Sequence, residues 1–276
     1  MKGKVFGIVA GISALFMASG LIAGEKTLVK WGADAKTLQK EWSGKIKYED
    51  LDGKFSAVVD SRSSVLLKKF IPVEAGKKYI LTGTFKSLGE EKSKIYYGFI
   101  CYGKKKKQIV TYHSNVILGS ATTLAQECKK GDKTVVIKAN KKWKAGSQAV
   151  AFNAKDDFSD LPNRETAYKI TKVVPEGENM KLNLSAPVKK AYPAGTKVRQ
   201  HTAAAGSYLY TTIVGNKMPK TWKTYSKSAT LGKPGQMGWK FFRPGTAFVR
   251  IIILPNYAKK KDEKVAYTDL NLKVSE

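Results

Sequence analysis

The chain has few of the residues from which most enzyme sites are built. It contains two cysteines, two histidines and 22 acidic residues among 276. With no Cys-x-x-Cys pair and so few histidines, a zinc site has almost no ligands available. The sequence also holds no Gly-x-Ser-x-Gly, His-Glu-x-x-His or phosphate-binding glycine motif. These absences speak against the common hydrolase, metalloprotease and nucleotide-binding classes.

The scarcity of cysteine leaves room for one disulfide at most. Cys101 and Cys128 are the only two cysteines. In an oxidising compartment an even count permits a bridge, whose loop closure is worth on the order of 3 kcal/mol. Cys101 lies in an apolar stretch and Cys128 in a polar one. A Cys101–Cys128 disulfide and two buried free thiols therefore both remain open.

A long apolar run occurs only near the N-terminus. Val5–Met17 carries no charge, follows the cationic Met1–Lys4 and precedes a segment of small residues that ends at Gly24. This layout is typical of a secretory signal peptide, and the run is shorter than the roughly 20 apolar residues of a membrane-spanning helix. We expect residues 1–24 to be removed, leaving no transmembrane anchor. The protein would then be exported to the periplasm, the cell surface or the medium.

Acidic residues are outnumbered by basic ones. Fifty Lys and Arg against 22 Asp and Glu give a formal net charge of +28. Such a charge attracts polyanions at long range, and salt should weaken the attraction. For an exported protein, anionic glycans, acidic envelope polymers and lipid headgroups are better candidates than nucleic acid, which we do not expect as a partner. Generic solubility explains the same charge equally well.

Short apolar runs are abundant, and the clearest lies within Phe70–Ser87. It indicates a strand end, a tight turn at Ala75–Lys78 and a longer strand. Alternate residues of that longer strand fall on one face, beginning with Tyr79 and Leu81. Gly76 can adopt the positive φ that such a turn often requires. This segment predicts a β-hairpin.

Similar runs continue to the C-terminus, separated by clusters of Gly, Pro, Asn, Asp or Lys. No segment beyond the signal peptide shows a long stripe of period 3.6. The pattern predicts an all-β protein, most simply a β-sandwich. The expected strands are Phe55–Val59, Val65–Leu67, Ile71–Phe85, Ile95–Tyr102, Ile109–Tyr112, Thr134–Ile137, Gln148–Phe152, Lys169–Val174, Met180–Leu184, Thr196–His201, Tyr208–Val214, Trp222–Tyr225, Phe248–Leu254 and Val265–Val274.

No linker or repeat divides the chain. The stretch Asp156–Arg199 differs in character, because turn-rich segments flank its short strands. We expect residues 25–276 to form a single β-sandwich domain with a small β-rich insertion around residues 153–200. Two lysine runs, Lys104–Lys107 and Lys259–Lys261, follow turn residues and are expected in exposed loops.

Three places in this pattern resemble the galactose-binding-like jelly-roll domains, in particular carbohydrate-binding modules of the xylan- and glucan-binding type. Gly53–Val59 is similar to the family's early strand, and Phe70–Ser87 is similar to its strand pair. Pro244–Ile251 and Val265–Leu272 are similar to its closing pair. These motifs cover the two ends of one domain and encode strands and turns. The resemblance implies a jelly-roll β-sandwich that binds polysaccharide.

The resemblance also implies a structural calcium ion. Related modules hold it with an acid of the closing strand, which corresponds to Asp269 here. Thr268 stands where the family commonly has a second acid. Glu49, Asp50 or Asp52 could supply further oxygens, and calcium takes about six or more. No other cofactor is expected.

Sugar-binding modules usually stack pyranose rings on exposed aromatic faces and fix them with polar side chains. Two clusters of the sequence have this composition. The first is Tyr112–Asn115, and the second consists of Arg199 and His201 together with Tyr208 and Tyr210. Tyr208 and Tyr210 lie two residues apart and so share a strand face, which suits stacking and core packing equally. The candidate ligand-binding residues are Tyr112, His113, Asn115, Arg199, His201, Tyr208 and Tyr210, and the further aromatic candidates are Tyr97, Tyr102, Trp143 and Trp239.

These observations lead to three hypotheses. The first is an exported, non-catalytic carbohydrate-binding protein for acidic or sulfated polysaccharide. The second is a structural envelope protein whose sandwich packs against other surface components. The third is a polysaccharide lyase, in which Tyr112, His113, His201 or Arg199 would supply a base and a cation. The strand motifs typical of jelly-roll alginate lyases are absent, so the lyase is the weakest of the three, and no catalytic residue is assigned.

Overall fold

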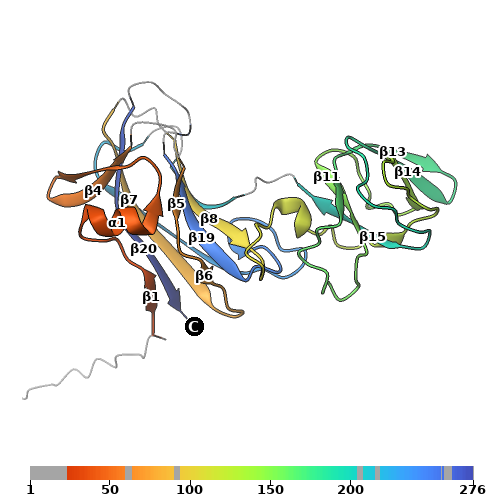
Figure 1. Ribbon diagram of the computed structural model, residues 1–276, viewed down its shortest axis with the longest axis horizontal. Coiled ribbons are helices and arrows are strands. Elements are labelled where there is room, and N and C mark those ends of the chain that lie inside the picture. Colours follow the sequence, from red (N-terminus) through yellow and green to blue (C-terminus); the bar gives the residue numbers. More distant parts are fainter. Residues whose placement is uncertain are drawn as a thin grey trace, which may run out of the picture.

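The computed structural model describes residues 24–59, 64–89, 94–203, 208–214, 218–255, 257 and 263–275. The expected signal peptide lies outside these ranges apart from Gly24, as does the Lys259–Lys261 run. In the described part of the chain the regular structure is almost entirely β, which confirms the all-β prediction. No helix in those ranges has the length or apolar character needed to cross a membrane. Figure 1 shows two bodies, one built from both ends of the chain and one from its middle.

Two sheets form the first body, which we call the sandwich. One sheet has the spatial order β18-β17-β7-β20-β4-β3, with β1 also paired to β20. Its strands are β1 (Lys26–Val29), β3 (Lys47–Leu51), β4 (Lys54–Val59), β7 (Lys78–Ser87), β17 (Lys223–Leu231), β18 (Phe241–Phe242) and β20 (Val265–Ser275).

The other sheet has the order β16-β8-β19-β5-β2, and β6 pairs with β19. Its strands are β2 (Trp42–Ser43), β5 (Val65–Leu67), β6 (Ile71–Pro72), β8 (Ile95–Tyr102), β16 (Leu209–Val214) and β19 (Phe248–Leu254). The helix α1 (Ala35–Glu41) precedes β2. The pairings are antiparallel except between β17 and β18.

The sandwich buries alternate side chains between its two sheets. Tyr79, Leu81 and Phe85 of β7 all lie in its core, as the sequence predicts. The turn before β7 contains Gly76, whose φ of +81° confirms the need for glycine. Because β20 pairs with both β4 and β7, strands from the two ends of the chain share one sheet. The sandwich is therefore of the jelly-roll type.

The second body lies between β8 and β16 in the sequence, and we call it the inserted body. One of its small sheets contains β10 (Thr134–Lys138), β13 (Ile170–Glu176) and β14 (Asn179–Leu184), and the other contains β9 (Thr122–Thr123), β11 (Gln148–Phe152), β12 (Thr166–Tyr168) and β15 (Lys197–Thr202). It has a separate hydrophobic core, from Leu124 to Val198. The segment expected as an insertion, residues 153–200, covers part of this body. A strand-length apolar run looks the same whichever core it joins. The sequence therefore could not show that β10 and β11 belong to the inserted body and not to the sandwich.

One further expectation needs correction, and one open alternative is decided. Ile109–Tyr112 is not a strand, because Tyr102 and Gln108 close a hairpin and the chain then leaves the sheet through a 3-10 turn at Thr111–His113. The two cysteines are both free and buried. Cys101 lies in the core of the sandwich and Cys128 in that of the inserted body, so of the two alternatives left open by the sequence the structure has the buried free thiols.

Candidate functional site

A hollow of about 230 Å³ lies beside β16, the edge strand of its sheet, and the β17–β18 loop. Tyr210 comes from β16 and Tyr208 from the residue just before it, while Trp239 comes from the loop and Phe241 from β18. One polar residue comes from the start of the inserted body, where the chain has just left the sandwich. The lining consists of Asn115, Tyr208, Leu209, Tyr210, Gln236, Met237, Gly238, Trp239, Phe241 and Arg243.

Aromatic rings form much of this hollow. Trp239 is 38% exposed, which is unusual for so large an apolar side chain. The Tyr208 and Tyr210 rings lie 6.1 Å apart between centroids and are half-buried. Tyr210 contacts Tyr96, which in turn contacts the exposed Tyr257, at centroid distances of 4.7 and 4.6 Å. A row of rings therefore extends from the hollow along β8.

Amide and guanidinium groups supply the polar part of the lining. Gln236 accepts a hydrogen bond at its side-chain oxygen from the backbone N–H of Lys233, at 2.8 Å. That bond fixes the loop and does not use the amide nitrogen of Gln236. Arg243 is held in place by donating to the carbonyl of Ile109, at 3.3 Å. The hollow thus offers fixed hydrogen-bonding groups beside apolar ring faces, as small-ligand sites commonly do.

Two ammonium groups lie over Trp239. Lys227 Nζ is 4.7 Å and Lys240 Nζ 5.3 Å from a ring centroid of the indole. Cation–π attraction of this kind orients both side chains toward the ring. A ligand stacked on Trp239 would therefore meet positive charge at its edge.

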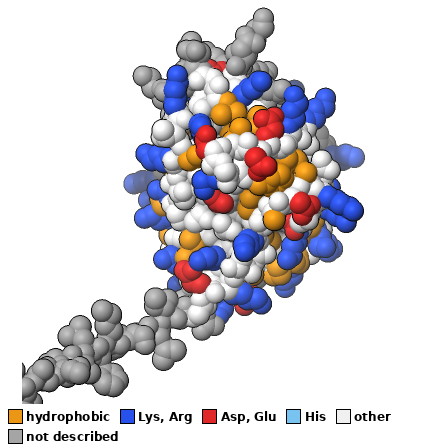
Figure 2. Space-filling view, turned by 90° about the vertical axis from the view of Figure 1, so that its left-hand side faces the viewer, with side chains coloured by type: hydrophobic (Ala, Val, Ile, Leu, Met, Phe, Trp, Pro, Cys, Tyr) orange, Lys and Arg blue, Asp and Glu red, His pale blue; other side chains and the backbone are white. Residues whose placement is uncertain are grey.

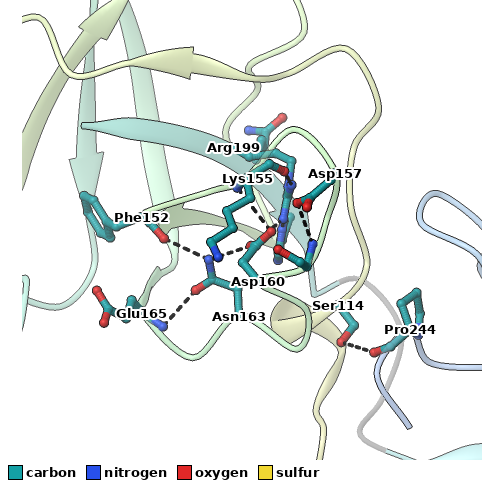
Figure 3. Close-up of polar contacts among 12 residues, drawn as sticks. Ser114, Phe152, Lys155, Asp157, Asp160, Asn163, Glu165, Arg199 and Pro244 are labelled. Atoms are coloured by element: carbon teal, nitrogen blue, oxygen red, sulfur yellow. Dashed lines mark hydrogen bonds and ion pairs between the residues drawn. The ribbon is translucent and has the colours of Figure 1, made fainter. Parts of the chain in front are cut away.

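Arg199 and His201 occupy a different, buried place on β15. Arg199 Nη2 donates to the Asp160 carboxylate at 2.7 Å (Figure 3), and its Nε donates to His201 Nε2 at 3.1 Å. Since Nε2 accepts, His201 carries its proton on Nδ1, which donates to the carbonyl of Tyr112 at 2.9 Å. His201 is 0% exposed, and burial is the main cause that lowers its pKa to about 4. The predicted ligand contact of His201 is therefore not supported, because its ring has no accessible nitrogen.

The same network fixes the loop around residues 153–165. Asn163 Nδ2 donates to Asp160 and to the Phe152 carbonyl, and its oxygen accepts from the Glu165 N–H at 2.8 Å (Figure 3). Each polar group of this buried cluster has a partner, as burial requires. The cluster is a structural support for the loop that faces the sandwich.

Tyr112 and His113 lie where the chain passes from one body to the other. The Tyr112 ring stacks on Tyr168, 5.3 Å away and nearly parallel. Burial lowers the pKa of His113 to about 4, assisted by two nearby arginines. The next residue, Ser114, donates from Oγ to the Pro244 carbonyl at 3.0 Å, as Figure 3 shows. These residues hold the junction between the bodies and do not line the hollow.

Three of the seven predicted ligand-binding residues, Asn115, Tyr208 and Tyr210, thus meet in one hollow. Trp239 joins them from the wider set of aromatic candidates, whereas Tyr97, Tyr102 and Trp143 are buried. Sequence reasoning missed Gln236, Met237 and Arg243. The sequence feature that could have indicated them is the segment Gly235–Trp239, in which two glycines predict a turn that carries Met237 and Trp239. Both of these side chains are exposed in the structure.

The carboxylates proposed for calcium do not fit that ion. Asp269 is half exposed and faces Lys54 Nζ at 3.4 Å. Asp52 pairs with Lys86 at 2.6 Å, and Glu49 and Asp50 are exposed on β3. Within the described ranges no three His, Cys, Asp or Glu side chains are placed to share a metal. Each of the better-placed acids is neutralised by lysine instead.

The sequence matches no protein-family model and no curated protein. Solved structures similar to this chain include a xylan-binding domain from Paenibacillus barcinonensis, at 7% identity and a TM-score of 0.39 over 93% of this chain and 99% of that one. Lectin II from Ulex europaeus is similar at 9% identity and a TM-score of 0.27, over 91% of this chain and 97% of that one.

Proposed function

We propose that this protein is an exported, non-catalytic carbohydrate-binding protein that holds a polysaccharide in the hollow around Trp239. The observation that carries the proposal is the meeting of an exposed indole, Tyr208 and Tyr210 with the amides of Asn115 and Gln236 in one cavity, where a hydrogen bond fixes that of Gln236. Ring faces pack against the C–H face of a pyranose, while amides bond to its hydroxyl groups.

The charge around the hollow supports acidic or sulfated chains as the preferred ligands. Lys227 and Lys240 lie over Trp239, and Arg243 lines the hollow. A uronate or sulfate group on a stacked sugar would meet these cations directly. Charge-assisted hydrogen bonds of this type are stronger than those between neutral groups.

Binding without catalysis is supported by the placement of the histidines. The chain has two, His113 and His201. Both lie outside the lining of the hollow, in the junction between the bodies. A lyase would need one of the tyrosines as its base. Incubation with alginate, pectate and glycosaminoglycans is expected to yield no unsaturated uronate by absorbance.

A panel of glycans tests the proposal, with Trp239→Ala as the decisive variant. Titration calorimetry with the best ligand should show an affinity loss of about ten-fold or more, because removal of a central Trp commonly costs on the order of 2 kcal/mol. Tyr168→Ala is the matched control, since Tyr168 is 39% exposed but lies on the inserted body outside the hollow. Its affinity should equal that of the unchanged protein. Absence of binding to every glycan at low salt would contradict the proposal, as would equal losses in the two variants.

A further inference from the structure

A second hollow, of about 460 Å³, lies where the two bodies meet, and its lining is basic. Lys104, Lys105 and Lys107 come from the turn after β8, and Arg164 comes from the inserted body. The other lining residues carry no charge and are Gly103, Ser159, Leu161, Pro162 and Gly245. We call this hollow the junction groove. Four positive charges line it, and no carboxylate does.

Three of the carboxylates nearest in sequence are paired elsewhere, and a fourth, Asp157, accepts the backbone N–H of Ser159 at 3.0 Å. Asp160 pairs with Arg199 at 2.7 Å, and Glu165 pairs with Lys190 at 2.9 Å. Asp156 pairs with Lys197. Over the described ranges, no ion pair involves the three lysines of the junction groove. Within the described part of the chain, these three lysines therefore lie close together without a directly paired carboxylate.

Backbone contacts from both bodies hold these charges together. The Gly103 N–H donates to the Lys107 carbonyl at 3.0 Å, which closes the turn. Arg164 Nη2 donates at 3.0 Å to the carbonyls of Lys107 and Gln108, which joins the turn to the inserted body. A Cβ on Gly245, whose φ is +80°, would lie 2.7 Å from the Leu161 carbonyl oxygen. The close approach at Gly245 fixes the groove from the sandwich side.

The fourth lysine of the run behaves differently. Lys106 Nζ lies 5.0 Å from the ring centroid of Phe70 and 5.8 Å from that of Phe248, over the outer face of the sheet. It does not line the groove. Three lysines of the turn therefore line the groove, whereas Lys106 packs over aromatic rings of the sandwich.

We propose that the junction groove binds the carboxylate or sulfate groups of an acidic polysaccharide. This inference rests on the proposed function, to which it adds a second contact. The segment after β18 serves both places, since Arg243 lines the hollow around Trp239 and Gly245 lines the groove. Anionic groups relieve the repulsion among four clustered cations, and that gain is largest at low salt.

Positive charge also occurs far from the groove. Figure 2 shows Lys and Arg side chains around the margin of the sandwich face that lies away from the inserted body. A test must therefore separate a local site from general attraction. Lys129, Lys130 and Lys133 provide the control, because they are exposed on the inserted body and do not line the groove.

The experiment compares the full chain with K104Q/K105Q/K107Q and with K129Q/K130Q/K133Q, which lose the same charge. Calorimetry at low salt uses polygalacturonate as the carboxylate probe, dextran sulfate as the sulfate probe and xylan as the neutral probe. The groove variant should bind at least one anionic probe about ten-fold more weakly, since three cationic contacts are removed together. The control variant should stay within about two-fold, and xylan affinity should not change. Which anionic probe responds identifies the group that the groove prefers.

Equal losses in the two triple variants would show attraction by overall charge alone and would overturn the groove as a site. Unchanged affinity for both anionic probes in the groove variant would overturn it too. Duplex DNA serves as a fourth probe, and a loss of affinity confined to it would assign the groove to another class of polymer and likewise overturn the proposal. If Trp239→Ala has no effect on affinity while the groove variant binds more weakly, the hollow is not a binding site and the junction groove is.

Discussion

His201 forms hydrogen bonds at both ring nitrogens, one of which holds the 3-10 turn at Tyr112 against β15, and this arrangement requires the neutral imidazole. Nε2 accepts from Arg199 and Nδ1 donates to the Tyr112 carbonyl. A second proton would turn the acceptor into a donor facing a guanidinium. Burial, together with the nearby charge of Arg199, lowers the pKa of His201 to about 4 from an ordinary value of 6.5, although the bond to the Tyr112 carbonyl acts in the opposite direction.

The sign of the pH effect follows from these pKa values. Between pH 4 and 6.5 the unfolded chain binds a proton at His201 that the folded chain does not. The free energy of unfolding therefore rises with pH across this window, by up to about 3 kcal/mol for a shift of this size. His113, whose pKa is also lowered to about 4, acts in the same direction but is less buried.

We expect His201→Gln to flatten this dependence. Glutamine keeps an amide near the Arg199 side chain and does not titrate, so the difference in stability between pH 7 and pH 4.5 should shrink. Urea denaturation at the two pH values measures it, and His113→Gln is the companion variant, with a smaller effect. An unaltered pH slope in His201→Gln would show that the buried imidazole does not control the acid sensitivity.

At the scale of elements, the pairing of β8 with β16 decides whether the hollow exists. Tyr210 lies opposite Gly98 in that pairing. A Cβ at Gly98 would lie 2.7 Å from the Cα of Tyr210 and would overlap the Leu209 carbonyl. The two strands approach this closely because residue 98 has no side chain. The position of the Tyr208 and Tyr210 rings therefore depends on a glycine outside the hollow.

Gly98→Ala is expected to lower the free energy of unfolding by about 2 kcal/mol, because the added methyl group must push the backbones of two strands apart. Chemical denaturation measures the loss, and glycan affinity should fall with it as the tyrosines move. Gly103→Ala is the control, since its Cβ would have no neighbour closer than 3.8 Å. Equal stability of the two variants would mean that the edge strand can shift without cost.

The elements that could be predicted from the sequence are those with an apolar side to bury. The expected runs match β8, β11 and β19 residue for residue. By contrast β3, with the sequence Lys-Tyr-Glu-Asp-Leu, is an exposed edge strand and has little apolar signal. The helix α1 is seven residues long and depends on a cap at Asp34, which is too little for a helical period to emerge.

The candidate site was predicted in part for a related reason. Strand β8 is apolar on both faces, so alternation does not tell which ring is buried. Tyr97 proves to be in the core and Tyr96 on the outer face. The hollow also joins Asn115 to residues near 210 and 240, and only the return of the chain from the inserted body brings these together.

At the scale of the whole molecule, the net charge of +28 attracts every anionic ligand, whereas the proposed sites in the hollow and the junction groove would select ligands that fit them. The first effect is long-ranged and screened, with a Debye length of about 10 Å at 0.1 M salt. Stacking on Trp239 is short-ranged and hardly depends on salt. The two contributions can therefore be separated by ionic strength.

Raising NaCl from about 0.02 M to about 0.3 M should weaken binding of polygalacturonate several-fold, because most of the long-range attraction is screened. Binding of neutral xylan should change little over the same range. Calorimetry at both concentrations checks this, with potassium chloride as the control for a specific ion. A neutral ligand with the same salt dependence would mean that stacking contributes little.

The inserted body leaves the sandwich after β8 and returns at β16, and these two strands lie side by side. Its entry and exit are therefore neighbours, and the excursion closes on itself like a hairpin loop of unusual size. A fold with that geometry can gain, lose or exchange the whole excursion without rethreading any other strand. Because residues of this excursion line both the hollow and the junction groove beside residues of the sandwich, an exchange of the excursion would alter both places at once.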